Sequence, residues 1–132
     1  MGQSALSGSE TTADAASVAS VRVAVLADDL IWSSRLRAAV ERAGAVAIPA
    51  RDAASINAPF VVIDLGGRAY DGIEAVRVAA ASAGTVVLAV AQHEDVDLRK
   101  AALAAGAKRV LSYNKMFSDG PAVITRLIEG TL

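Results

Sequence analysis

From Val21 onward, the chain alternates between short, continuously apolar runs and longer stretches in which apolar residues recur at helical spacing. The runs consist mostly of Val, Ile, Leu and Ala with few polar interruptions, which is typical of strands buried on both faces of a parallel sheet. They lie at 21–27, 45–50, 60–65, 85–91 and 109–113. The pattern therefore predicts five strands.

Four clear helices are predicted between and after these strands, with a cramped fifth helix at 51–57. The clear ones lie at 31–44, 71–83, 95–105 and 119–129. Pro121 lies near the start of the last helix, where proline is tolerated, and Gly44 and Gly106 stand where helix C-caps are expected.

Strict alternation of strands and helices predicts right-handed crossovers and a parallel sheet with helices on both faces. Five strands in about 110 residues fit a flavodoxin-like, doubly wound α/β fold with strand order 2-1-3-4-5. Residues 1–20 differ, because seven of the twenty are Ser or Thr and no periodicity is present. We therefore predict a flexible tail at 1–20 and one domain at 21–132.

The composition narrows the classes of function. Thirteen basic and fourteen acidic residues give a net charge of -1, so the basic surplus typical of nucleic-acid binders is absent. The chain has no Cys and a single His, which excludes disulfides, thiolate zinc sites and multi-histidine metal sites. No apolar run approaches the length of a membrane span. These features predict a cytoplasmic protein with no nucleic-acid or membrane partner.

Aspartates end two of the predicted strands. Asp28 and Asp29 follow the first strand and Asp64 ends the third, and these strands are neighbours in the predicted order. Carboxylates crowded at one sheet edge repel one another unless a cation neutralises them, and oxygen ligands suit Mg²⁺. One carboxylate can also act as a nucleophile toward a phosphoryl group. An Asp after a strand commonly caps a helix as well, so that interpretation stays open.

In this order, the segments 27-ADDL, 62-VIDL, 71-DG and 101-AALAAGAKRVL resemble a response regulator receiver domain of the chemotaxis type, across roughly residues 20–130. The resemblance implies that Asp64 accepts a phosphoryl group and that Mg²⁺ is bound by Asp28, Asp29, Asp64 and the backbone carbonyl of Gly66. It also implies a sensor histidine kinase or another signalling protein as partner, permits a homodimer, and describes a signalling protein rather than an enzyme.

The sequence departs from the receiver pattern at the phosphate pocket. The usual Thr or Ser at the end of the fourth strand corresponds to Ala91, which has no hydroxyl. The usual Lys-Pro pair after the fifth strand falls on Tyr113 and Asn114, and Lys115 comes one residue after Asn114. Loss of the lysine removes a positive charge from the place where transition-state charge develops.

Three hypotheses follow. The first is a stand-alone, atypical receiver with Mg²⁺-dependent phosphorylation at Asp64 and output by protein contact, since no output segment follows Leu132. The second is a pseudo-receiver that acts as a protein-interaction module without phosphorylation. The third, a flavodoxin-like domain that binds a small molecule, has no cofactor motif in its favour.

Overall fold

The computed structural model describes residues 21–132 and shows one five-stranded parallel sheet in the order β2-β1-β3-β4-β5. The predicted fold class is therefore confirmed, whereas the predicted tail at 1–20 lies outside the described residues. The strands are β1 (Arg22–Leu26), β2 (Val46–Ala50), β3 (Phe60–Asp64), β4 (Val86–Ala91) and β5 (Arg109–Ser112). The helices are α2 (Leu30–Arg42), α3 (Gly72–Ala80), α4 (Val96–Ala105) and α5 (Tyr113–Glu129).

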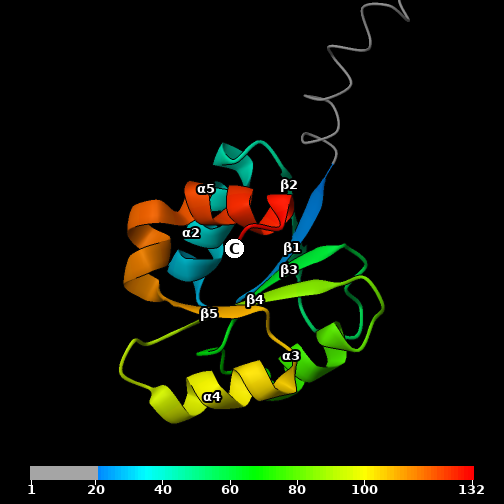
Figure 1. Cartoon of the computed structure of the whole chain (residues 1–132), viewed down its shortest axis with the longest axis vertical. Helices are drawn as coiled ribbons and strands as arrows, with labels where there is room; N and C mark the ends of the chain where they lie inside the picture. The colour runs from blue at the N-terminus through cyan, green and yellow to red at the C-terminus, as the bar shows by residue number, and fades with distance from the viewer. Residues whose placement is uncertain (1–20) are drawn as a thin grey trace, which may run out of the picture.

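Helices cover both faces of the sheet (Figure 1), with α2 and α5 on one face and α3 and α4 on the other. Alternate residues of the central strands point into two separate apolar cores, so β1, β3 and β4 are buried almost throughout. This two-sided burial explains why these strands read as continuous apolar runs. In the part of the chain that is described, no helix is both long enough and apolar enough to cross a membrane.

One predicted helix is absent, and one boundary between a strand and a helix differs from the prediction. The segment 51–57 contains turns and bends instead of a helix, because the Asp52 carboxylate accepts a hydrogen bond from the Ser55 backbone N–H and closes a local turn. The fifth strand ends at Ser112, and the last helix starts at Tyr113, six residues before the predicted position.

The early start of α5 has a local cause. The Ser112 hydroxyl accepts a hydrogen bond from the Lys115 backbone N–H at 3.1 Å, which is an N-cap. The helix then kinks at Asp119 (φ -128°), so Pro121 lies at the start of its second segment, where the missing N–H matters little. Tyr113 consequently leaves the strand and opens a helix at the carboxyl edge of the sheet.

Candidate functional site

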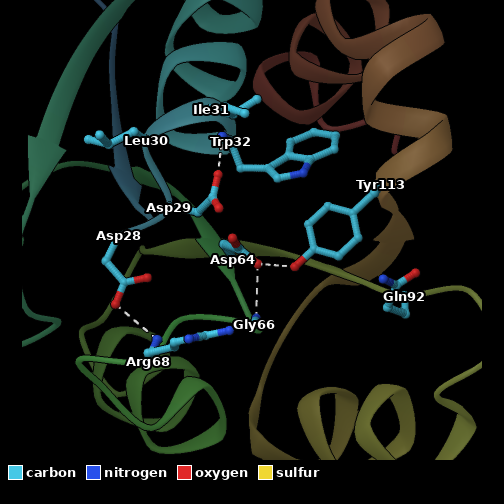
Figure 2. Close-up of a pocket in the computed structure, with 10 residues that line it drawn as sticks. All are labelled: Asp28, Asp29, Leu30, Ile31, Trp32, Asp64, Gly66, Arg68, Gln92 and Tyr113. Atoms are coloured by element: carbon cyan, nitrogen blue, oxygen red, sulfur yellow. Dashed lines mark hydrogen bonds between the residues drawn. The ribbon is translucent and has the colours of Figure 1, made fainter.

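The carboxyl edge of the sheet carries an open cleft of about 940 Å³ between the starts of α2 and α5 and the loop after β3. Figure 2 shows the ten residues that line it. They are Asp28, Asp29, Leu30, Ile31, Trp32, Asp64, Gly66, Arg68, Gln92 and Tyr113. The three predicted aspartates therefore border one cavity, as expected where the order of strands reverses around β1 and β3.

Asp28 connects the end of β1 to the loop after β3. Its Oδ2 atom accepts hydrogen bonds from the backbone N–H groups of Arg68 at 2.9 Å and Ala69 at 2.6 Å. The hydrogen bond from Ala69 is the main cause of a lowered pKa for this carboxyl, and the charge of Arg68 adds to the effect. Asp28 is thus a carboxylate that holds the loop in place.

Asp29 is the N-cap of α2. Its Oδ1 atom accepts a hydrogen bond from the Trp32 backbone N–H at 2.9 Å. The capping role that the sequence left open is therefore present, and it occupies one of the two carboxylate oxygens. The other oxygen lies on the side of the cleft (Figure 2).

Asp64 ends β3 and is the only buried charged residue among residues 21–132, with 2% of its surface exposed. Its Oδ1 atom accepts a hydrogen bond from the Gly66 backbone N–H at 2.9 Å and a second from the Tyr113 hydroxyl. Burial is the main cause of a raised pKa for Tyr113, followed by the hydrogen bond to Asp64, so the phenol is neutral at ordinary pH and donates.

The second tyrosine of the chain lies beneath the same edge but contacts different atoms. The Tyr70 hydroxyl lies 3.1 Å from the Leu26 carbonyl oxygen and 2.6 Å from the Asp64 carbonyl oxygen, so it links the ends of β1 and β3. Burial, followed by the charge of Asp64, raises the pKa of Tyr70. Tyr70 therefore stabilises the backbone beneath the site and leaves the carboxylate free.

The donor set fits a hard divalent cation. Each of the three aspartates uses one carboxylate oxygen for the hydrogen bonds described above, and no hydrogen bond from the described residues reaches the other oxygen. Within residues 21–132, however, no group of three or more acidic, His or Cys side chains is drawn together closely enough to hold a metal by itself. Mg²⁺ needs only one or two carboxylates, because water and phosphate oxygens complete its shell.

The positions that depart from the receiver pattern have distinct environments. Tyr113 donates a hydrogen bond to Asp64, Ala91 is buried at the end of β4, and Asn114 is exposed on α5. Lys115 forms an ion pair with Asp119 at 2.7 Å, so its amine is engaged outside the cleft. These environments give the cleft a tyrosine hydroxyl where a receiver has a lysine amine.

Sequence reasoning did not assign a role in the site to Arg68 or Gln92, although both line the cleft. Arg68 is the only cation among the lining residues, and neither ion pair of residues 21–132 includes it. Its place four residues after Asp64, in a loop tied to Asp28, is a signal that the sequence contains. A loop arginine is usually solvated, so the signal was weak.

No protein-family model matches the chain, and a comparison with curated proteins finds no match. Solved structures match in fold. The BeF3-activated DrrB receiver domain superposes with a TM-score of 0.72 at 17% identity, covering 83% of this chain and 98% of its own. The chain has the fold of a response regulator receiver domain. The beryllofluoride-activated NtrC4 receiver domain dimer gives 0.68 at 22% identity, covering 84% of this chain and 98% of its own.

A third matching structure contains a metal ion. The receiver domain of a sensor histidine kinase from Pseudomonas aeruginosa PAO1, with a magnesium ion coordinated in its active site cleft, has a TM-score of 0.69 and 16% identity. The alignment covers 83% of this chain and 98% of that one. At these identities the matches establish the receiver fold, while the chemotaxis-type subdivision remains a prediction.

Proposed function

We propose that this chain is an atypical receiver that takes a phosphoryl group on Asp64 in a Mg²⁺-dependent reaction and passes the signal on by protein–protein contact. The observation that carries the proposal is the convergence of Asp28, Asp29 and Asp64 on one cleft at the carboxyl edge of a receiver fold. A sensor histidine kinase is the proposed phosphodonor, and the cytoplasm is the proposed location. A homodimer is compatible with this proposal.

In the proposed reaction, the free Oδ2 oxygen of Asp64 attacks the phosphorus of the donor in line with the leaving group. The new oxygen–phosphorus bond gives an acyl phosphate, and the leaving group departs with the electron pair of the bond that breaks. Bound Mg²⁺ would neutralise charge on the carboxylates and on the phosphoryl oxygens. Asp28, Asp29, Asp64 and the Gly66 carbonyl are the proposed ligands.

Arg68 is the cleft residue best suited to meet the remaining charge of the phosphoryl group. Its backbone is held by the hydrogen bond to Asp28, and in Figure 2 its side chain extends along the cleft toward Gly66. Planar guanidinium groups bind phosphate oxygens well. We include Arg68 in the proposed site as a substitute for the missing lysine.

The test is the intact mass of the protein after incubation with acetyl phosphate, with and without Mg²⁺. We expect a phosphoryl adduct that requires Mg²⁺, disappears in Asp64→Asn and persists in Asp71→Asn. Asp71 is the matched control, because this aspartate caps α3 and does not line the cleft. An adduct that persists in Asp64→Asn would place the phosphoacceptor elsewhere.

The pseudo-receiver remains the second candidate, favoured by the hydrogen bond from Tyr113 to Asp64 and by the apolar Ala91. Tyr113 and Ala91 stand at the positions where the receiver pattern has a lysine and a hydroxyl residue, so the groups that bind and sense a phosphoryl group are replaced. Absence of an adduct at every Mg²⁺ concentration, in a folded protein, would favour this candidate. The protein would then act through its surface without phosphorylation.

A further inference from the structure

The hydroxyl of Tyr113 binds the carboxylate that the proposed reaction uses. It donates to Asp64 Oδ1, and the same oxygen also accepts the Gly66 backbone N–H. A hydrogen bond to a charged acceptor stabilises the carboxylate and makes it a weaker nucleophile. Asp64 is almost fully buried, and both it and Tyr113 line the cleft.

Gly66 makes room for this arrangement. A Cβ atom at this position would lie 2.7 Å from the Tyr113 hydroxyl oxygen, closer than real Cβ atoms approach other atoms. The glycine at 66 therefore allows the Tyr113 hydroxyl to reach Asp64. Any larger residue at 66 would push the hydroxyl away from Asp64.

The ring of Tyr113 packs against the ring of Trp32 in α2. Its centroid lies 4.6 Å from that of Trp32 in a tilted arrangement, and the Arg35 guanidinium lies 5.3 Å from the Trp32 ring and 4.7 Å from the Phe117 ring. Such aromatic and cation–π contacts favour one ring position. Tyr113 is thus held over the carboxylate by α2 as well as by its own helix.

We propose that the Tyr113 hydroxyl is a gate on Asp64: while it is bound to Oδ1 it slows attack by the Oδ2 atom of the same carboxylate, and its departure releases the reaction. The proposal rests on the proposed function, because it assumes that Asp64 is the reacting group. When the hydroxyl leaves, the Tyr113 ring moves relative to Trp32, which is the only tryptophan of the chain. Opening of the gate therefore changes the fluorescence of Trp32.

The direct test compares initial rates of phosphoryl uptake from acetyl phosphate, with Mg²⁺, in the wild type and in Tyr113→Phe. The variant keeps the ring beside Trp32 and removes only the donor. We expect uptake to be about tenfold faster, the effect of losing one charge-assisted hydrogen bond. Tyr70→Phe is the matched control, because the Tyr70 hydroxyl binds backbone carbonyls, and its rate should match that of the wild type.

Gly66→Ala provides an independent variant, since the added Cβ displaces the same hydroxyl without changing Tyr113. It should raise the uptake rate and shift the Trp32 emission as the gate opens. Equal or slower uptake in both Tyr113→Phe and Gly66→Ala, with an adduct present in all proteins, would overturn the gate and leave the proposed function intact.

A second measurement does not depend on phosphorylation. Labelling with a water-soluble carbodiimide and glycine ethyl ester, read by peptide mass at Asp64, reports how readily this carboxyl reacts. We expect faster labelling in Tyr113→Phe than in the wild type or Tyr70→Phe. If no protein forms a phosphoryl adduct, the proposed function fails, and equal labelling in the three proteins would then overturn the gate as well.

Discussion

At the scale of single residues, the two tyrosines of the chain show how one residue type performs different tasks at one sheet edge. Tyr70 donates toward backbone carbonyls and fastens β1 to β3, whereas Tyr113 donates to a carboxylate. The sequence places Tyr113 at a phosphate-pocket position through its resemblance to receivers, but its contact with Asp64 depends on the early start of α5. The motif alone therefore predicts that Tyr113 lies at the pocket, but it does not predict the hydrogen bond to Asp64.

Gly67 is a position where the structure requires the absence of a side chain. An added Cβ would lie 2.1 Å from the Tyr70 ring. We expect Gly67→Ala to lower the free energy of unfolding by about 1–3 kcal/mol, the usual cost of overpacking. Urea unfolding followed by circular dichroism measures the change.

Gly84→Ala is the control for that measurement. At this position an added Cβ meets nothing within 4 Å, and only the positive φ of +81° opposes it. Backbone strain there should cost about 1 kcal/mol. A larger loss for Gly84→Ala than for Gly67→Ala would contradict the steric role of Tyr70.

At the scale of helices and strands, apolar periodicity predicted every strand and four helices because burial imposes a different repeat on each. The periodicity gave wrong elements or boundaries where a single polar side chain determines the local backbone structure. Ser112 ends an apolar run and also caps α5, and that cap makes a helix of residues that read as a strand end and a loop. Asp52 acts similarly by closing a turn.

Aspartates at helix starts illustrate why candidate site residues are hard to judge from sequence. Asp29, Asp71 and Asp95 all cap helices through the same hydrogen bond, yet only Asp29 lines the cleft. The capping role of Asp29 and its proposed metal-binding role would use different oxygens of one carboxylate. They can therefore be separated by substitution.

Asp29→Asn keeps an oxygen for the cap but loses the charge, while Asp29→Ala loses both. We expect Asn to retain the stability of the wild type and Ala to cost about 1 kcal/mol. Both variants should bind Mg²⁺ about tenfold more weakly or worse, because each loses the charge of a proposed ligand. Losses of this size are the lower end of the range for substitutions at metal sites. Trp32 fluorescence titrated with Mg²⁺ measures affinity.

Asp71→Asn serves as the comparison in that titration, because it changes the same group at another helix start outside the cleft. Its Mg²⁺ affinity should equal that of the wild type. An unchanged affinity in Asp29→Asn would remove Asp29 from the proposed metal site while leaving its capping role in place.

At the scale of the whole molecule, the sheet has an apolar core on each face, and Asp64 is the one buried charged residue among residues 21–132. The sheet order that brings Asp28, Asp29 and Asp64 together could be predicted, because it follows from alternation and handedness. The side-chain hydrogen bonds around them could not, because they depend on where loops and helix starts lie to within one residue. Stability at alkaline pH tests these hydrogen bonds in the complete fold.

Both tyrosines have a raised pKa in the folded protein, relative to the ordinary value of 10.0, because burial and the charge of Asp64 disfavour the phenolate. The folded state therefore holds these protons more tightly than the unfolded chain does. Their contribution to stability is complete below pH 10.0 and is lost as the pH rises from there through the raised pKa. We expect the urea midpoint of the wild type to fall more steeply above this pH than that of Tyr113→Phe or Tyr70→Phe. The three proteins differ only in these two hydroxyl groups, so the difference between their pH profiles isolates the phenols. Parallel pH profiles in the three proteins would show that neither hydroxyl is held as the structure describes.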